Sequence, residues 1–181
     1  SLAADGALAL RTVVVPAGQF VTVAGQGATA FYVLHMANQG AGSTGPLPTP
    51  QGPGRWVRKK FAGSDEARRY QEQVTGRPAA DLYYIGDVEF DGFAKGELLE
   101  AKGPNYKNFF DRTGEPKPWF VESGGFDGLI NQAKQQSIQA KKAGLSLEWH
   151  VADAEVVGFL KRHFHDAGID GIHIIHTPPL L

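Results

Sequence analysis

The sequence predicts an α/β fold in which helices cover both faces of a central mixed sheet. Segments typical of helices and of strands alternate through the second half of the chain, which favours strands buried between helices. Leu98 and Leu99 are consecutive apolar residues in one strand-like run, as in a central strand that is buried on both faces. The chain has 181 residues, of which 42% are hydrophobic, enough for one domain with its own core and a short appendage.

Composition narrows the class of protein. The absence of cysteine excludes disulfides, thiolate metal sites and cysteine nucleophiles. No run approaches the ~18 apolar residues that span a bilayer, so no membrane partner is expected. The chain begins at Ser1 without methionine or a signal-peptide pattern, and we expect a fragment of a longer polypeptide.

Charge is more informative in its distribution than in its sum of −1. Residues 81–100 contain six acids and one lysine, and basic residues gather on either side, at 55–69 and 134–142. An acidic centre between basic segments suits a metal site that faces phosphates. Ordinary charge scatter explains the same pattern about equally well.

The N-terminal third is expected to lie outside the main domain. Residues 38–54 contain five glycines, four prolines and no charge, which is typical of a linker or a surface loop. We therefore predict an N-terminal extension over 1–54 and the main domain over 55–181. Apolar runs in the extension are expected to form strands, or strands and a short helix, at 12–15, 20–24 and 30–36.

The main domain is predicted to open with a helix and a strand. Ser64 can cap a helix whose first turn carries Asp65 and Glu66, both favourable at a helix N-terminus. This helix is expected to end at Gly76, before a strand at 82–85.

A β-hairpin is predicted next, from runs at 88–93 and 96–102 that flank a three-residue break ending on Gly96. Side chains on a strand alternate between its two faces, so Glu100 and Lys102 share a face of the second run. If the strands pair, Asp91 on the first run joins them in one site.

Residues 103–125 are expected to form a long irregular insertion over this site, because glycine, proline and aromatic residues alternate there. Its aromatic residues could stack bases or simply cover the core: they include Tyr106, Phe109, Trp119 and Phe120.

The last elements are predicted from apolar periodicity. A helix over 126–143 has one apolar stripe, and Gln132 and Gln136 border that stripe, which places them at the edge of the sheet. The remaining elements are a strand at 147–151, a helix from the Asp153 cap to Gly168, and a strand at 171–176. The predicted order from residue 64 is α-β-β-β-α-β-α-β.

Asp91, Glu100 and Lys102 form the candidate site. Two carboxylates offer the oxygen ligands that Mg²⁺ or Mn²⁺ prefers, and a lysine beside them can stabilise charge or orient a water at a phosphodiester. Charged residues on a hairpin are more often a solvated face. A glycosidase carboxylate pair is a second alternative, but Lys102 would lower both carboxyl pKa values and disarm a general acid.

This order, with Asp on the second strand and Glu-x-Lys on the third, resembles the PD-(D/E)xK nucleases of the restriction-endonuclease fold. Over residues 64–178 the chain is similar to the fifth family of restriction-endonuclease-fold toxins. No proline precedes Asp91, where Phe90 stands, but members of this fold often lack that proline. The residues that carry the resemblance are Tyr70-Gln71, Thr75-Gly76, Glu89-Phe90-Asp91-Gly92, Leu98-Leu99-Glu100-Ala101-Lys102-Gly103, Tyr106, Gln132 with Gln136, Glu148-Trp149-His150-Val151 and His176-Thr177-Pro178.

The resemblance implies a role for each site residue. Asp91, Glu100 and the backbone carbonyl of Ala101 would bind Mg²⁺ or Mn²⁺, and Lys102 would position or deprotonate the attacking water. Gln132 and Gln136 would orient the lysine or touch the substrate backbone. The activity implied is a metal-dependent nuclease, acting on DNA rather than RNA. A catalytically inactive nuclease fold that serves as a binding module, and an RNase, remain as alternatives.

The resemblance also implies a biological setting. Members of this family are toxin domains of polymorphic and type VI secretion effectors, delivered into the cytoplasm of a rival bacterium. Implied partners are nucleic acid, a secretion-apparatus, carrier or chaperone protein, and a cognate immunity protein that holds the toxin inactive in the producer's cytoplasm.

Histidines are not expected to form a metal site. His163 and His165 point ~200° apart on a helix, and His173 and His176 lie on opposite faces of a strand. His150 faces away from its neighbour Trp149, and a hydrogen-bonded edge histidine is favoured over a place in the site. Gln71 and Glu72 on the first helix could support the site, but polar side chains on a solvated helix face are the favoured explanation.

Overall fold

Two sheets meet at Asp91 in the main part of the chain. The computed structural model describes residues 11–15, 19–23, 45–47 and 52–180. The predicted first run of the hairpin is interrupted at Asp91, so that its two halves pair with different partners. The interruption matters for function because it places a carboxylate where the two sheets separate.

The larger sheet has the order β6-β7-β8-β9 and is mixed. Strand β6 (Gly92–Ala94) pairs antiparallel with β7 (Glu97–Lys102), whereas β7 lies parallel to β8 (Ser146–Val151) and β8 parallel to β9 (Ile172–His176). Parallel neighbours need crossover connections, and helices supply them here. The mixed sheet predicted from the sequence is confirmed.

The smaller sheet is antiparallel, with the order β3-β4-β5. Strand β4 (Asp81–Ile85) is buried at all five positions and lies between β3 (Arg55–Arg58) and β5 (Val88–Phe90). The strand predicted over 82–85 is therefore the centre of this sheet.

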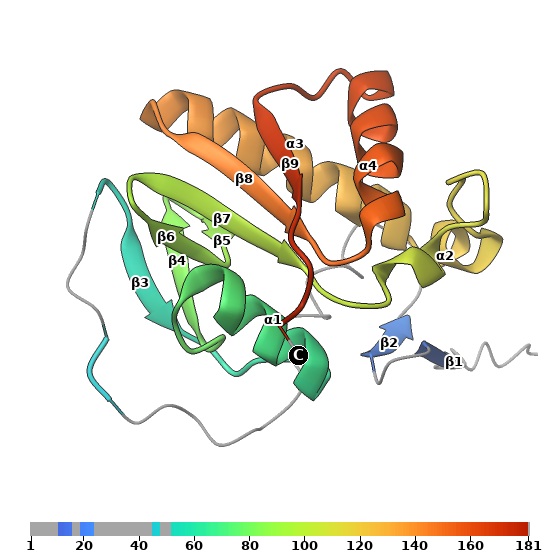
Figure 1. Cartoon of the computed structure of the whole chain (residues 1–181), viewed down its shortest axis with the longest axis horizontal. Coiled ribbons are helices and arrows are strands. Elements are labelled where there is room, and N and C mark those ends of the chain that lie inside the picture. The colour runs from blue at the N-terminus through green and yellow to red at the C-terminus, as the bar shows by residue number, and fades with distance from the viewer. Residues whose placement is uncertain (1–10, 16–18, 24–44, 48–51, 181) are drawn as a thin grey trace, which may run out of the picture.

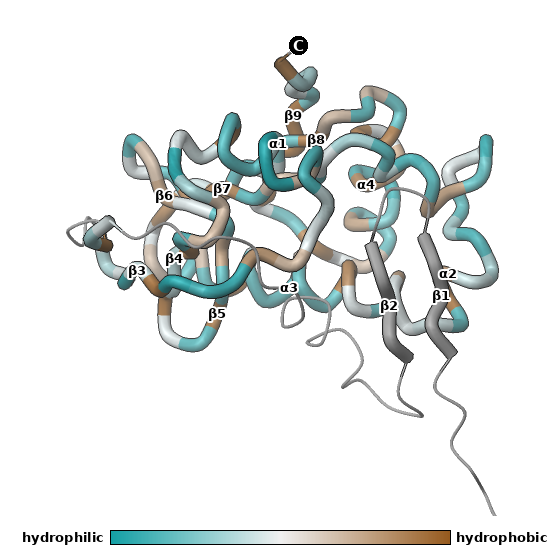
Figure 2. The backbone as a smooth tube through the Cα atoms, turned by 90° about the horizontal axis from the view of Figure 1, so that it is seen from below, coloured by the Kyte–Doolittle hydropathy of each residue, from teal (hydrophilic) through white to brown (hydrophobic). Residues whose placement is uncertain are grey.

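Helices cover both faces of the mixed sheet, as predicted (Figure 1). Helix α1 (Asp65–Thr75) packs against β6 and β7 on one face, while α3 (Gly125–Ala143) and α4 (Ala154–Asp166) pack against β8 on the other. Hydrophobic and hydrophilic positions alternate along the backbone (Figure 2), as expected for elements with one buried side.

Local signals place the ends of these elements. Ser64 Oγ accepts a hydrogen bond from the backbone N–H of Ala67 at 3.1 Å, and Gly76 ends α1 with a φ of 66°. The hairpin turn between β6 and β7 contains only Lys95 and Gly96, both with positive φ, which matches the right-handed twist of the strands. The turn is thus one residue shorter than the sequence predicted.

The insertion at 103–125 is more regular than predicted. It contains the 3-10 helix η2 (Tyr106–Phe109) and the short helix α2 (Pro118–Glu122), and Phe110 and Pro116 form a β-bridge between them. Proline at the first position of α2 favours a helix start, because its missing N–H would have no partner there. Periodicity does not identify helices as short as these.

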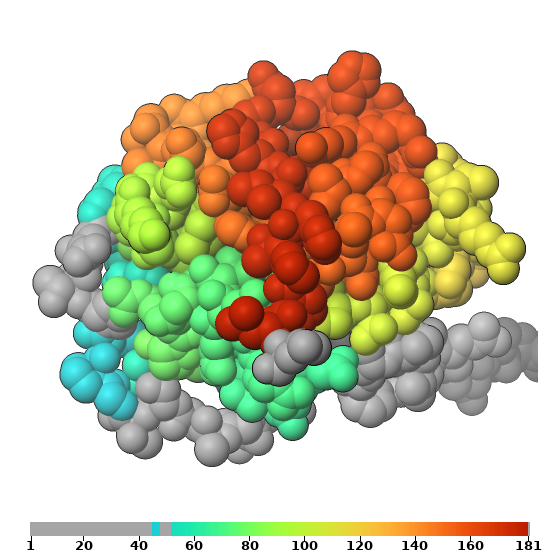
Figure 3. All heavy atoms as spheres, in the orientation of Figure 1, coloured from blue at the N-terminus to red at the C-terminus, as the bar shows by residue number. Residues whose placement is uncertain are grey.

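The C-terminal segment after β9 lies between α1 and α4 on the surface (Figure 3). The hydroxyl of Tyr70 donates to the carbonyl of Thr177 at 2.8 Å, and Gln73 bonds to the backbone of Pro178 and of Leu180. Helix α1 therefore holds the C-terminal segment in place.

Two of the N-terminal runs form strands, β1 (Arg11–Val15) and β2 (Gln19–Val23), which pair antiparallel. The third run, at 30–36, and most of the predicted linker lie outside the described residues. The division of the chain at residue 54 stays a prediction. Among the described residues, no helix has both the length and the apolarity needed to cross a membrane.

Candidate active site

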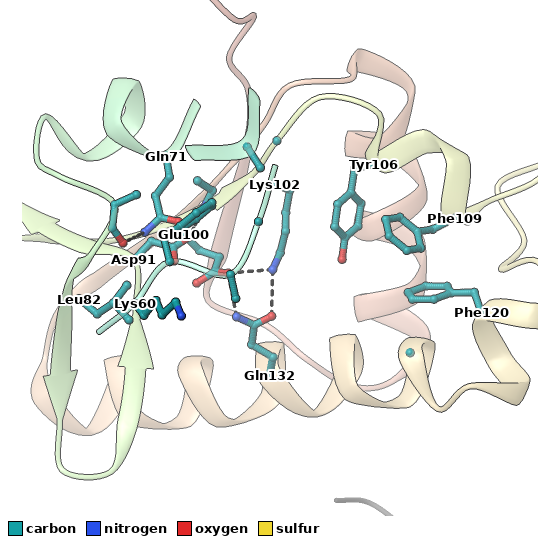
Figure 4. Close-up of a pocket in the computed structure, with 18 of the residues that line it drawn as sticks. Lys60, Gln71, Leu82, Asp91, Glu100, Lys102, Tyr106, Phe109, Phe120 and Gln132 are labelled. Carbon is teal, nitrogen blue, oxygen red and sulfur yellow. Dashed lines mark hydrogen bonds and ion pairs between the residues drawn. The ribbon is translucent and has the colours of Figure 1, made fainter. Parts of the chain in front are cut away.

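Asp91, Glu100 and Lys102 lie together in the folded chain, with only 6%, 3% and 8% of their surfaces exposed. Glu100 and Lys102 occupy alternate positions of β7 and therefore point to the same face, toward α3 (Figure 4). Asp91 occupies the junction between β5 and β6 and reaches β7 from there. Buried charges need partners, so their contacts decide what this cluster can do.

Glu100 is held by three donors. Its Oε1 accepts hydrogen bonds from Lys102 Nζ and from Gln132 Nε2, both at 2.7 Å, and its Oε2 accepts from Gln136 Nε2 at 2.7 Å. Lys102 Nζ also donates to Gln132 Oε1 at 2.9 Å, so the Gln132 amide bridges the carboxylate and the ammonium. These bonds fix the rotamers of both charged side chains.

The sequence predicted Gln136 at the edge of the sheet, but the structure buries it. It is 1% exposed and donates to the backbone carbonyl of Glu89 at 2.9 Å as well as to Glu100. It contacts Glu100 rather than Lys102, whereas half-buried Gln132 contacts both. The difference arises because α3 packs against β5 and β8, and these strands cover the Gln136 side chain.

Trp149 also belongs to the site, a place that spacing along the chain does not predict. Its Nε1 donates to Gln136 Oε1 at 2.8 Å, and because indole only donates, this bond turns the Gln136 amide so that its NH₂ faces Glu100. Lys102 Nζ lies 4.4 Å from the centroid of the Trp149 ring, a cation–π distance. The parallel pairing of Glu100 with Trp149 puts both on one face, which only knowledge of the register would reveal.

Asp91 is oriented by the backbone of β7. Its Oδ2 accepts a hydrogen bond from the N–H of Ala101 at 2.8 Å. A cavity of about 160 Å³ lies beside this contact, and Asp91, Glu100, Ala101, Lys102 and Gln132 all line it. The two carboxylates and the lysine therefore open onto one space that a substrate group can enter.

Lys102 is held in its charged form. Burial lowers its pKa, but the negative charge of Glu100, its hydrogen bond to the ammonium group and the charge of Asp91 outweigh burial, and the net pKa is raised. Burial also raises the pKa of Tyr106 and keeps its phenol neutral. The charged ammonium group of Lys102 therefore lies beside the carboxyl groups of Glu100 and Asp91 in the cavity.

The donor set fits a hard divalent cation. The ligand atoms that Asp91 and Glu100 offer are carboxyl oxygens, which hard divalent cations prefer. Within the described residues, no group of three or more His, Cys, Asp and Glu side chains is placed to hold a metal ion. The protein therefore offers few ligands, which suits Mg²⁺ because that ion retains several waters.

The other candidates lie away from this cluster or serve the fold. His150 points to the opposite face from Trp149, where its ring nitrogens contact Thr177 Oγ1 at 2.8 Å and Glu148 Oε2 at 3.2 Å. Gln71 lines the cavity wall and donates to the carbonyl of Ala79 at 3.1 Å.

The remaining polar candidates are engaged elsewhere. Glu72 pairs with Arg68 along α1. His163 bonds to the carbonyl of Gly114 and stacks on Phe110, whereas His165 is exposed. The contacts of His163 and the solvent exposure of His165 account for these two polar residues without a bound ligand.

Residues 67–154 match the family model of restriction endonuclease fold toxin 5. The resemblance found in the sequence is confirmed over this segment. The matched segment contains Asp91, Glu100, Lys102, both glutamines of α3 and Trp149, and the match supports a nuclease-like effector toxin. A search of curated proteins found no match to the chain.

Proposed function

We propose that this protein is a metal-dependent endonuclease that acts as an antibacterial toxin and hydrolyses phosphodiesters of DNA. The observation that supports this most strongly is the cluster of Asp91, Glu100 and Lys102. The three side chains are buried, fixed by hydrogen bonds and open onto one cavity, in a segment that matches a toxin family of the restriction endonuclease fold.

Asp91, Glu100 and the backbone carbonyl of Ala101 would hold the metal ion. When bound, Mg²⁺ or Mn²⁺ supplies Lewis-acid stabilisation of the phosphoryl oxygens and lowers the pKa of a coordinated water. The contacts of Glu100 with Gln132 and Gln136 keep its carboxylate in place before the ion arrives. Preorganised ligands of this kind reduce the rearrangement that binding requires.

Lys102 orients the attacking water and places its positive charge against the phosphate, where negative charge develops. Gln132 holds the ammonium group in position through its 2.9 Å bond. The water oxygen bonds to phosphorus as the bond from phosphorus to the leaving sugar oxygen breaks. The proton lost by the water is balanced by the proton that the leaving oxygen gains, so the products are a phosphomonoester and a hydroxyl group.

An active nuclease of this kind endangers the cell that makes it. We therefore propose a cognate immunity protein that holds the toxin inactive in the producer's cytoplasm. Delivery would use a contact-dependent route such as type VI secretion, with the protein bound to the apparatus or to a carrier or chaperone. The target would be nucleic acid in the cytoplasm of the recipient bacterium.

The test is cleavage of plasmid DNA and of RNA by the full chain with Mg²⁺, with Mn²⁺ and with EDTA. We expect cleavage of DNA that depends on the metal, and its loss in Asp91→Ala and Glu100→Ala variants that remain folded. Asp87→Ala is the matched control, because this exposed aspartate lies outside the cavity. Full activity in either site variant would show that the substituted residue is not a metal ligand. A wild-type protein that cleaves neither DNA nor RNA would favour the binding-module alternative.

A further inference from the structure

The cavity has an aromatic end that the proposed hydrolysis does not use. It lies on the other side of Lys102 from Asp91, as Figure 4 shows, and is lined by Tyr106, Phe109, Trp119 and Phe120. These side chains come from η2 and α2, the two short helices of the insertion. The cavity therefore joins a charged end to an apolar end.

The aromatic end is rigid because its rings pack against one another. Phe109 is the centre of the group, with ring-centroid distances of 4.6 Å to Phe120, 4.9 Å to Tyr106 and 5.5 Å to Trp119. Phe120 is fully packed, but Tyr106, Phe109 and Trp119 are only partly buried. These three rings therefore pack against the core and also line the cavity.

The burial of the charged end limits how a nucleic acid can reach it. Glu100 is 3% exposed and Lys102 is 8% exposed, so a phosphate has to enter the cavity to meet them. A phosphate that enters draws its nucleoside toward the cavity, and a base that leaves the duplex stack there can reach the aromatic rings. The neighbouring aromatic rings offer a surface that replaces the lost stacking.

We propose that the aromatic end of the cavity binds an unstacked nucleobase next to the scissile phosphate. This inference rests on the proposed nuclease function and adds the substrate class: nucleic acid with unpaired nucleotides. Unpaired nucleotides are favoured because unstacking costs least where a base is already free of its partner. Stacking accepts any base, so little sequence preference is expected.

The first test compares substrates for the full chain with Mg²⁺. Oligonucleotides of one sequence are supplied as a single strand, as a duplex and as a duplex with an unpaired bulge. We expect the single strand and the bulge to be cut at least tenfold faster than the plain duplex. Equal rates would overturn the base subsite and leave the nuclease function intact.

A binding measurement decides the same question without catalysis. In EDTA, fluorescence anisotropy gives the affinity of the full chain for a short oligothymidine and for an abasic oligomer of the same length and charge. We expect the abasic oligomer to bind at least tenfold more weakly. Equal affinities would show that only the phosphates are recognised and would overturn the proposal, whether or not cleavage is observed.

Variants locate the subsite. Trp119→Leu and Phe109→Leu remove a flat ring but keep an apolar side chain, and we expect each to raise KM for the single strand about 5- to 140-fold, the range that loss of one base stack implies. The effect on kcat should be smaller, and Trp119→Phe should restore most of the affinity.

The matched control is Phe159→Leu, because this ring is also partly buried and packs on Phe110 but lies outside the cavity. It should leave KM unchanged. An equal rise in KM for Phe159→Leu would mean that the aromatic rings act only through the stability of the fold, and this would overturn the subsite.

Discussion

Lys102 is the residue for which the structure makes the sharpest kinetic prediction. Replacing it by methionine removes the only ammonium group that contacts Glu100 in the described site, while the length and apolar stem of the side chain remain. We expect the cleavage rate to fall at least a hundred- to a thousandfold, or ~2.7–4 kcal/mol, as for loss of one preorganised charge-stabilising group. Steady-state cleavage of DNA measures this loss. Lys134→Met, an exposed lysine of α3, is the control that should keep full activity.

The two glutamines of α3 should separate stability from catalysis. Gln136→Ala leaves the Trp149 N–H and one oxygen of Glu100 without their partners in a buried place, so we expect a loss of about 1–3 kcal/mol in the free energy of unfolding. Gln132→Ala should lose less than ~1 kcal/mol because Gln132 is only half-buried, and it should slow cleavage by releasing Lys102. Urea unfolding and cleavage rates measure the two effects; identical stabilities would contradict the different roles inferred here.

Single residues also show what the sequence could reveal about the site. The shared face of Glu100 and Lys102 was predictable because alternation along a strand is a local rule, and the place of Asp91 beside them followed from the expected pairing of the two runs. The burial of Gln136 and the part played by Trp149 were not, because they depend on the register between β7 and β8 and on how α3 packs. Neither can be read from spacing along one element.

At the level of elements, the approach of α1 to β6 depends on Gly92. A Cβ at this position would lie 2.8 Å from Thr75 Cγ2, and the Thr75 hydroxyl is tied to the carbonyl of Gln71, so the side chain cannot move aside freely. We expect Gly92→Ala to destabilise the fold by about 1–3 kcal/mol, as overpacking does. Because Gly92 is the neighbour of Asp91, a shift of the backbone there would also displace the Asp91 carboxylate, so the rate of DNA cleavage should fall as well.

Gly158 in the middle of α4 provides a control of opposite sign. A Cβ there meets no atom within 4 Å, so Gly158→Ala should stabilise the protein by roughly 0.5–1 kcal/mol through helix propensity. Urea midpoints of both variants and the wild type test the pair. A stable Gly92→Ala variant would show that α1 and β6 can separate without cost.

Most elements were predictable because caps and periodicity act within a few residues. The helix from Ser64 and the long helix ending at Gly144 are both confirmed, with left-handed glycines at their C-termini. The short helices η2 and α2 were missed because their packing against Phe110 and α3, rather than their own periodicity, makes them regular. The break of the strand at Asp91 was not predictable either, because it depends on pairing with distant strands: β5 pairs with β4, whereas β6 pairs with β7.

At the scale of the whole molecule, the site exists only in the folded chain. Asp91 comes from the junction of the two sheets, Glu100 from β7, and their supporting amides from α3. A metal ion that binds this arrangement has no equivalent site in the unfolded chain. Metal binding must therefore stabilise the fold by linkage.

The proposed metal site thus predicts a thermal shift that needs no substrate. At a Mg²⁺ concentration about a hundredfold above its dissociation constant, the free energy of unfolding should rise by ~2.7 kcal/mol and raise Tm accordingly. EDTA should reverse the shift, and Asp91→Ala should abolish it because one of the two carboxylates is lost. Lys102→Met should retain the shift, since Glu100 no longer forms its 2.7 Å ion pair with Lys102 and stays available to the ion. Scanning calorimetry of the three proteins measures these differences, and an equal shift in wild type and Asp91→Ala would place the metal elsewhere.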